Sequence, residues 1–125
     1  MYKNRKIIIS TILIFNLWPV LSLYAGNLLS SVYNRPNPFS PLKEETEIIY
    51  TLSKDAGVEI WIFSLIGNLV RKYSFASGEE GGKSGLNTIK WDGRNGEERV
   101  VADGVYLAVI TAGGETKIRK IGVLK

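Results

Sequence analysis

The sequence predicts an all-β fold, namely an antiparallel β-sandwich of about seven short strands preceded by an N-terminal signal-peptide helix. From Thr46 onward, apolar side chains alternate with polar ones, which is the period of a strand with one buried face. Turn signals rich in Gly, Asn, Asp and Ser interrupt this alternation at intervals of about 8 to 12 residues. No segment after the first 25 residues has the period of a helix.

The alternation also places the individual strands. We expect them over residues 46–52, 58–63, 69–75, 86–91, 105–111 and 117–124, with a surface loop at 77–85 and a glycine-rich hairpin at 111–115. In the last strand, Ile118 is out of phase with Ile121 and Val123. A β-bulge near Arg119–Lys120 would bring the three onto one face.

The stretch from Trp91 to Tyr106 connects two of these strands and organises the rest. It contains two turn signals, Asp92-Gly93 and Asp103-Gly104. Asp suits such turns because its carboxylate can accept hydrogen bonds from the backbone just ahead, and Gly tolerates positive φ. We expect the aromatic rings at the two ends to anchor both strands in one core.

Residues 1–25 have the pattern of a secretory signal peptide. Three positive side chains, those of Lys3, Arg5 and Lys6, precede an apolar run that ends near small Ala25. We therefore expect cleavage after Ala25 and an exported chain that is periplasmic, outer-membrane-associated or extracellular. The alternative is an uncleaved anchor, because the run approaches the roughly 20 residues that span a bilayer.

The domain organisation follows from this signal. We expect a signal peptide over 1–25, a linker over 26–35 and the sandwich domain over 36–125. Three prolines within residues 36–41 forbid a helix and favour an extended entry into the first strand. Phe39, which lies between these prolines, is expected to tuck its ring under the first strand as a plug.

Composition excludes several classes of function. The chain has no cysteine and no histidine, so it lacks thiolate metal ligands, the commonest metal ligand and the commonest general base. Its 16 basic and 12 acidic residues suggest a basic protein, but three of the positive charges lie in the signal peptide. The remaining chain is nearly balanced, which removes most of the support for nucleic-acid binding.

Three motifs with possible chemistry have better structural explanations. Gly78 and Gly82-Lys83-Ser84 approach a phosphate loop, but the spacing is one residue short and no helix follows. The oxygens of Asp92, Asn95 and Glu97 could ligate calcium, although turn capping explains them better. The adjacent glutamate pairs lie in loops, where their side chains diverge. We expect no cofactor, no metal site and no enzymatic activity.

The order and spacing of short motifs resemble the Ig-like domain of the FlgD family, which is named for the flagellar hook-capping protein. The motifs are Asn37-Pro38-Phe39, Ile48-x-Tyr50-x-Leu52, Val58-x-Ile60-x-Ile62, Gly67-x-x-Val70-Arg71, Trp91-Asp92-Gly93-Arg94, Gly104-Val105-Tyr106 and Lys120 to Lys125. The resemblance covers about residues 33–125 and implies an Ig-like or fibronectin-III-like sandwich. It also extends to the C-terminal sorting domains of type IX secretion.

Two positions depart from the family pattern. Ser64 stands where an aspartate is usual before the Gly67 turn, and Glu98 stands where the loop before Val101 commonly has glycine. Neither change is expected to alter the fold. The family module usually follows a large passenger, whereas here it follows the signal almost directly.

Two groups of side chains are candidates for binding. Trp61 and Phe63 alternate with the buried residues of their strand, so they form either an exposed contact patch or a second covered face, with the linker as one cover. The last strand carries Lys117, Arg119 and Lys120, which either guard an edge strand against pairing or are recognised by a secretion machinery.

These observations predict an exported, non-enzymatic Ig-like module that acts as a structural or protein-interaction domain of a secreted or cell-envelope protein. The alternative is a C-terminal sorting domain for type IX secretion, including a piece of a longer secreted protein. The expected partner is a protein or the secretion machinery, and no nucleic acid. Contact with a membrane is expected only through the signal segment, if it stays uncleaved.

Overall fold

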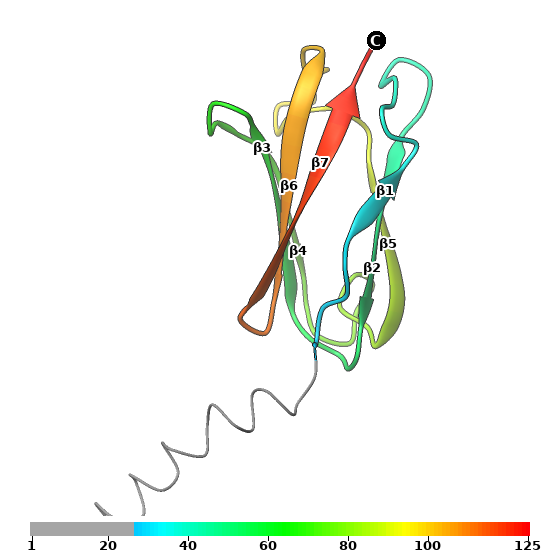
Figure 1. Cartoon of the computed structure of the whole chain (residues 1–125), viewed down its shortest axis with the longest axis vertical. Helices are drawn as coiled ribbons and strands as arrows, with labels where there is room; N and C mark the ends of the chain where they lie inside the picture. Colours follow the sequence, from blue (N-terminus) through cyan, green and yellow to red (C-terminus); the bar gives the residue numbers. More distant parts are fainter. Residues whose placement is uncertain (1–26) are drawn as a thin grey trace, which may run out of the picture.

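The computed structural model describes residues 27–125, and the expected signal-peptide helix lies outside them. This part of the chain forms an all-β sandwich, which confirms the predicted fold class (Figure 1). No helix that could cross a membrane occurs within it. The strands are β1 (Tyr33–Arg35), β2 (Thr46–Leu52), β3 (Val58–Ser64), β4 (Leu69–Phe75), β5 (Gly85–Trp91), β6 (Gly104–Ala112) and β7 (Glu115–Val123).

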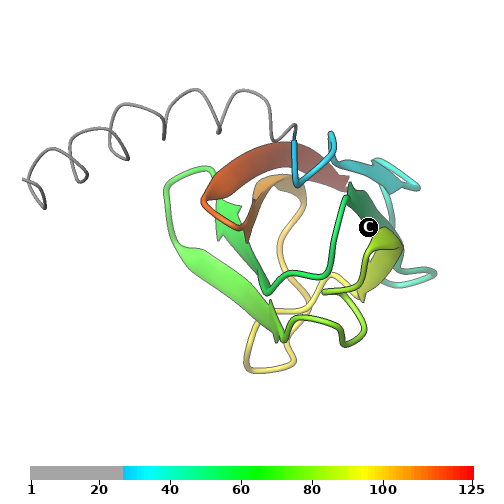
Figure 2. The same ribbon diagram turned by 90° about the horizontal axis from the view of Figure 1, so that it is seen from below.

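The seven strands form two antiparallel sheets that face each other across the core (Figures 1 and 2). One sheet has the order β1-β2-β5 and the other has the order β4-β3-β6-β7. In a constant-type Ig domain the fourth strand belongs to the first sheet. Here β4 pairs with β3 instead, and the second sheet gains a fourth strand.

Apolar side chains from both sheets fill the space between them, as the alternation predicts. Trp91, at the end of β5, is completely buried. The rings of Phe39 and Tyr106 meet its indole edge-on, with centroid distances of 5.5 Å and 5.7 Å. Phe39 is therefore a core plug, and Trp91 and Tyr106 anchor their strands in one core as predicted.

Both polar atoms of these anchors are satisfied by nearby backbone. The Trp91 indole N–H donates to the Arg94 carbonyl at 3.0 Å, and the Tyr106 hydroxyl donates to the Ala102 carbonyl at 2.7 Å. The second bond is the tyrosine corner of Ig-like sandwiches, in which a tyrosine near the start of the sixth strand bonds the chain just upstream. It fixes the path of the chain into β6.

The chain before Pro36 differs from the expected linker. Leu29 is fully buried and forms a bridge with Leu52, Val32 is also buried, and β1 pairs with β2. These residues belong to the sandwich because two apolar side chains, three residues apart, reach the core. A strand of only three residues is too short to show a period in the sequence.

β7 also differs from the expectation, because it has no bulge. Its pairing with β6 runs without interruption from Glu115 to Val123. Ile121 and Val123 are buried, whereas Ile118 points outward and is 62% exposed. The irregularity lies elsewhere, between Ile62 and Phe63 in the pairing of β3 with β4.

The Asn37-Pro38-Phe39 motif holds the end of β7. The Asn37 amide donates to the Lys120 carbonyl, and its oxygen accepts from the Gly122 N–H at 2.8 Å. Phe39 adds a short parallel bridge, donating to the Gly122 carbonyl and accepting from the Leu124 N–H. Residues 37–39, which we call the clasp, thereby cover the edge of β7 near its C-terminal end.

Candidate interaction surface

The outer face of the four-stranded sheet carries an apolar patch built by all four strands. Trp61 and Phe63 lie on the side of β3 opposite to its buried residues. Cross-strand pairing aligns two rows, because directly opposite residues of an antiparallel pair share a face. The first row is Lys72, Trp61, Val109 and Ile118; the second row is Leu69, Phe63, Leu107 and Lys120.

The side chains of this patch are incompletely covered. Leu69 is 55% and Ile118 is 62% exposed, while Trp61, Phe63, Leu107 and Val109 are half-buried. Val105 extends the patch along β6, and Leu65 and Ile66 extend it into the β3–β4 turn. Isolated exposed apolar residues are ordinary, but a contiguous group on one sheet face is typical of a contact surface.

The structure also shows what covers Trp61. The Lys72 ammonium lies 5.6 Å from the centre of the indole ring and 4.0 Å from the Glu59 carboxylate. The segment that we expected as a linker runs along β2 in the other sheet and does not reach Trp61. Among the described residues, the cover is therefore a single flexible lysine and the neighbouring side chains of the same sheet.

The outer face of the other sheet has a different character. There, Arg35, Glu47 and Lys90 align across β1, β2 and β5, and the first two form an ion pair at 3.7 Å. Ile49 on the same face is buried, and Thr88 and Thr51 complete the β2–β5 pairing. This face is mixed, because exposed Tyr33 and Leu86 also belong to it. It has no row of apolar side chains as long as those of the four-stranded sheet, where the apolar patch spans all four strands.

The three basic residues of β7 do not share one face. Lys120 belongs to the outer face, whereas Arg119 points to the opposite side of β7. The Arg119 guanidinium donates a hydrogen bond from Nε to the side-chain oxygen Oδ1 of Asn34 at 2.8 Å. Asn34 is buried and also donates to Thr46 at 2.9 Å. Arg119 thus ties β7 to β1 and β2, and Lys117, two residues away, lies on the same side as Arg119.

The turns between strands are ordered by polar side chains. Asp92 accepts from the Arg94 N–H at 3.0 Å, and Asn95 accepts from the N–H groups of both Glu97 and Arg99. Gly93 has φ 73°. These side-chain oxygens cap turns, and no group of three or more acidic side chains in residues 27–125 gathers where it could hold a metal ion.

The two positions that depart from the motif pattern of the FlgD-type resemblance, Ser64 and Glu98, have local explanations. The Ser64 hydroxyl accepts from the Asn68 N–H at 3.1 Å, which is the capping bond that an aspartate would make beside Gly67. Gly67 itself has φ 89°. Glu98 has φ 64°, the conformation that a glycine adopts without cost, and its carboxylate pairs with Arg71 at 3.1 Å.

The loop with Gly78 and Gly82-Lys83-Ser84, whose sequence approaches a phosphate loop, is packed against the sandwich. Gly81 and Gly82 are buried, and the Gly81 carbonyl accepts a hydrogen bond from the Tyr50 hydroxyl at 2.6 Å. Burial raises the pKa of the Tyr50 phenol. Burial also raises the pKa of Tyr106, with a smaller contribution from Asp103.

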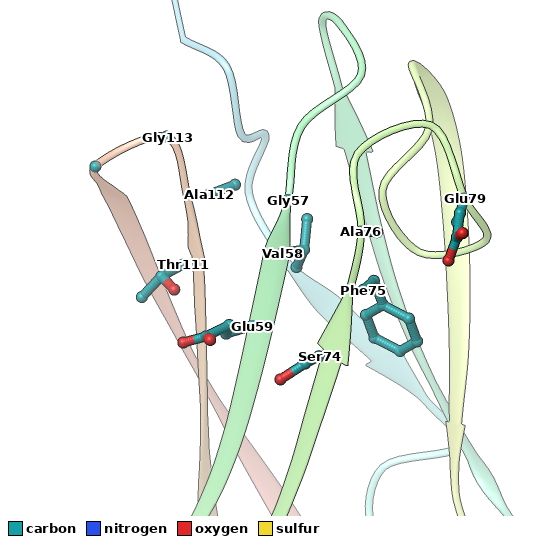
Figure 3. Close-up of a pocket in the computed structure, with 11 residues that line it drawn as sticks. Gly57, Val58, Glu59, Ser74, Phe75, Ala76, Glu79, Thr111, Ala112 and Gly113 are labelled. Carbon is teal, nitrogen blue, oxygen red and sulfur yellow. The ribbon is translucent and has the colours of Figure 1, made fainter.

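An open groove of about 670 Å³ lies where β3 starts, β4 ends and the β6–β7 hairpin turns. Figure 3 shows the side chains of Glu59, Ser74 and Thr111 on one side of it, and those of Phe75 and Glu79 on the other. The first three form the polar row that borders the apolar patch. The two carboxylates do not converge, so the groove offers no pair for acid–base chemistry.

No protein-family model matches the sequence, and no curated protein matches it. Among solved structures, the chain is similar to part of PorZ, described as an essential bacterial surface component of the type-IX secretion system of Porphyromonas gingivalis. The TM-score is 0.52 and the sequence identity is 22%. The two share a fold. The alignment covers 75% of this chain and 11% of the PorZ chain.

The sequence identified part of the patch and missed the rest. Trp61 and Phe63 stood out because two aromatic residues alternate with buried ones. Leu69, Leu107 and Ile118 did not, since each is unremarkable within its own strand. Only the register between strands brings them together. The hydrogen bonds of buried Asn34 with Thr46 and Arg119 are not signalled by any motif in the sequence.

Proposed function

We propose that this chain is an exported, non-enzymatic Ig-like module that acts as a protein-interaction domain of a secreted or cell-envelope protein. The observation that carries the proposal is the apolar outer face of the four-stranded sheet. Burial of apolar area is the main driving force of protein association. A half-buried Trp–Phe pair with exposed Leu69 and Ile118 beside it has the composition of an interface core.

Export is part of the same proposal and has its own test. The chain should lose residues 1–25 and be found in the periplasm, at the outer membrane or outside the cell. N-terminal sequencing of the protein from fractionated cells is expected to start at Gly26. A chain that keeps Met1 and sediments with membranes would instead support the uncleaved anchor.

The interaction surface can be tested with one pair of matched variants. Ile118→Lys places a charge on the patch, and Leu86→Lys places the same charge on the other sheet, where Leu86 is 69% exposed. We expect chemical cross-linking in intact cells to give adducts for the wild type and Leu86→Lys but not for Ile118→Lys. Equal adducts for all three would refute a binding role for this face.

A second candidate function is a C-terminal sorting domain for type IX secretion. It is supported by the motif resemblance over about residues 33–125 and by the fold shared with part of PorZ. In this hypothesis, the secretion machinery recognises the last strand with Lys117, Arg119 and Lys120. The clasp keeps that strand in the sandwich, while Leu124 is 62% exposed beside it.

A reporter fusion tests the sorting hypothesis. The reporter belongs between Gly26 and Asn27, because an insertion after Ser30 would separate buried Leu29 from buried Val32. In a host with a type IX system, we expect a sorting domain to carry the reporter outside the cell and to be cut from it. Retention of an intact fusion in the periplasm would exclude sorting and leave the interaction module.

A further inference from the structure

We propose that the partner of the apolar patch is a second copy of this chain, packed sheet on sheet about a two-fold axis that runs along the strands. This inference rests on the proposed interaction function and names its partner. Two sheets of the same twist can pack face to face, aligned and about 10 Å apart. A second copy supplies such a sheet with matching width and strand number.

The charges of the patch permit this self-pairing. Lys72 lies at the β4 end of the first row, and Lys120 lies at the β7 end of the second row. The proposed axis places β4 of one copy over β7 of the other and keeps each row opposite itself. Lys72 then faces Ile118 of the second copy, and Lys120 faces its Leu69, so no lysine lies directly opposite a lysine. Lys72 of one copy and Lys120 of the other lie in neighbouring rows at the same exposed edge of the interface.

The remaining pairs are also compatible. Trp61 faces Val109 of the second copy, Phe63 faces its Leu107, and the Glu59 carboxylate faces its Thr111. Lysine stems can cover apolar side chains while their ammonium groups reach solvent at the rim. The pattern is therefore an apolar centre with the lysines at its rims, and the same patch serves both copies, as in an isologous interface.

The size of the face sets the expected strength. The face is four strands wide, about 4.8 Å apart, and three rows long, about 7 Å apart: the two apolar rows and the polar row of Glu59. It therefore covers roughly 400 Å² of flat area per copy. With side-chain relief and the Leu65–Ile66 turn, two copies bury on the order of 1,000 Å², the lower end for specific interfaces. We therefore expect a dissociation constant in the micromolar range rather than the nanomolar range.

Sedimentation equilibrium of the exported chain, from about 1 to 500 μM, tests this inference. We expect a monomer–dimer equilibrium that Leu86→Lys leaves unchanged. Ile118→Lys should raise the dissociation constant at least about 30-fold, because the new charge faces Lys72 of the other copy. Ile118→Glu should raise it clearly less, because the glutamate meets that same lysine. Both substitutions are at an exposed site, and unchanged melting temperatures will show that the fold is intact.

Two results would overturn the inference. One is a chain that stays monomeric at every concentration; the other is a dimer that responds equally to Ile118→Lys and Ile118→Glu. If the chain is monomeric but Ile118→Lys still removes a cross-link to a different envelope protein, the proposed function stands and only the second copy is excluded. If Ile118→Lys changes neither dimer nor cross-link, both fail. Flotation with phospholipid vesicles that Ile118→Lys abolishes would assign the face to a membrane instead.

Discussion

At the scale of single residues, the Trp91–Tyr106 connection depends on a glycine with no room for a side chain. Gly93 has φ 73°, and a Cβ built on it would lie 2.5 Å from the Pro41 Cβ. Gly93→Ala is therefore expected to lower the free energy of unfolding by about 2–4 kcal/mol, from backbone strain and overpacking together. Urea denaturation measures this. Gly96→Ala, at a site open to solvent, should change it by less than about 0.5 kcal/mol.

Tyrosine burial makes stability dependent on alkaline pH. The folded state raises the pKa of Tyr50, Tyr73 and Tyr106 by burying their phenols, and the ordinary pKa of tyrosine is about 10. Above that pH, the unfolded chain has lost protons that the folded chain still holds. The free energy of unfolding is therefore expected to be constant below about pH 9 and to fall as pH rises past 10.

Tyr50→Phe provides the matching variant for this pH dependence. It removes the most strongly shifted phenol, so the fall in stability above pH 10 should be shallower than in the wild type. At neutral pH it should cost about 1 kcal/mol, because the Gly81 carbonyl loses its hydrogen-bond donor. Guanidinium denaturation at a series of pH values gives both quantities. Parallel pH profiles for the two proteins would contradict the assignment to Tyr50.

At the scale of elements, the clasp determines how firmly the last strand is held. Asn37→Ala removes two hydrogen bonds to β7 and one to Asn34, and we expect a loss of about 1–2 kcal/mol because water can replace part of them. Hydrogen exchange should become faster at the Gly122 and Leu124 amides. Asn68→Ala, in the β3–β4 turn, should leave both stability and exchange unchanged. Equal protection in the two variants would mean that Phe39 alone secures the strand.

The sequence pattern predicts most of the strands but not all of them. Period-two alternation predicts the bounds of most strands from β2 to β6 nearly to the residue, most clearly where one face is buried, as with Val58, Ile60 and Ile62 in β3. β4 has no fully buried residue, and its bounds follow from the turn before it and the loop after it. The alternation fails for β1, whose three residues are held by pairing with β2 and by Asn34 rather than by their own pattern. The alternation also leads to a wrong expectation for Ile118. An apolar residue that faces outward interrupts the pattern in the same way as a β-bulge would, so the sequence suggested a bulge that β7 does not have.

The candidate surface was only half predictable for the same physical reason. A single strand reveals which of its residues share a face, so Trp61 and Phe63 could be singled out. Which residues of other strands stand beside them depends on turn lengths and on the irregularity at Ile62/Phe63. A shift of one residue in β6 would replace Leu107 and Val109 by the core residues Ala108 and Ile110. The patch is therefore a property of the sheet, and no single strand contains it.

At the scale of the whole molecule, the structure moves the start of the folded unit from Pro36 to about Leu28. Leu29 and Val32 are buried in the core, Asn34 links Thr46 to Arg119, and the Leu28 N–H donates to the Glu115 carboxylate at 2.6 Å. The segment before the clasp thus closes the side of the sandwich where the two sheets meet at β1 and β7. A chain without it would expose apolar core and leave buried polar groups without partners.

Truncation tests this boundary. A chain of residues 36–125 loses two buried apolar side chains, each contributing about 1.5–3 kcal/mol, in addition to the β1–β2 pairing and the Asn34 hydrogen bonds. Because single domains are stable by only about 5–15 kcal/mol, we expect this chain to lose cooperative thermal unfolding, whereas residues 27–125 should keep it. Circular dichroism and calorimetry on the two chains decide the matter. If residues 36–125 unfold at the same temperature as 27–125, the segment is a linker after all, and a reporter inserted after Ser30 would leave the sandwich intact.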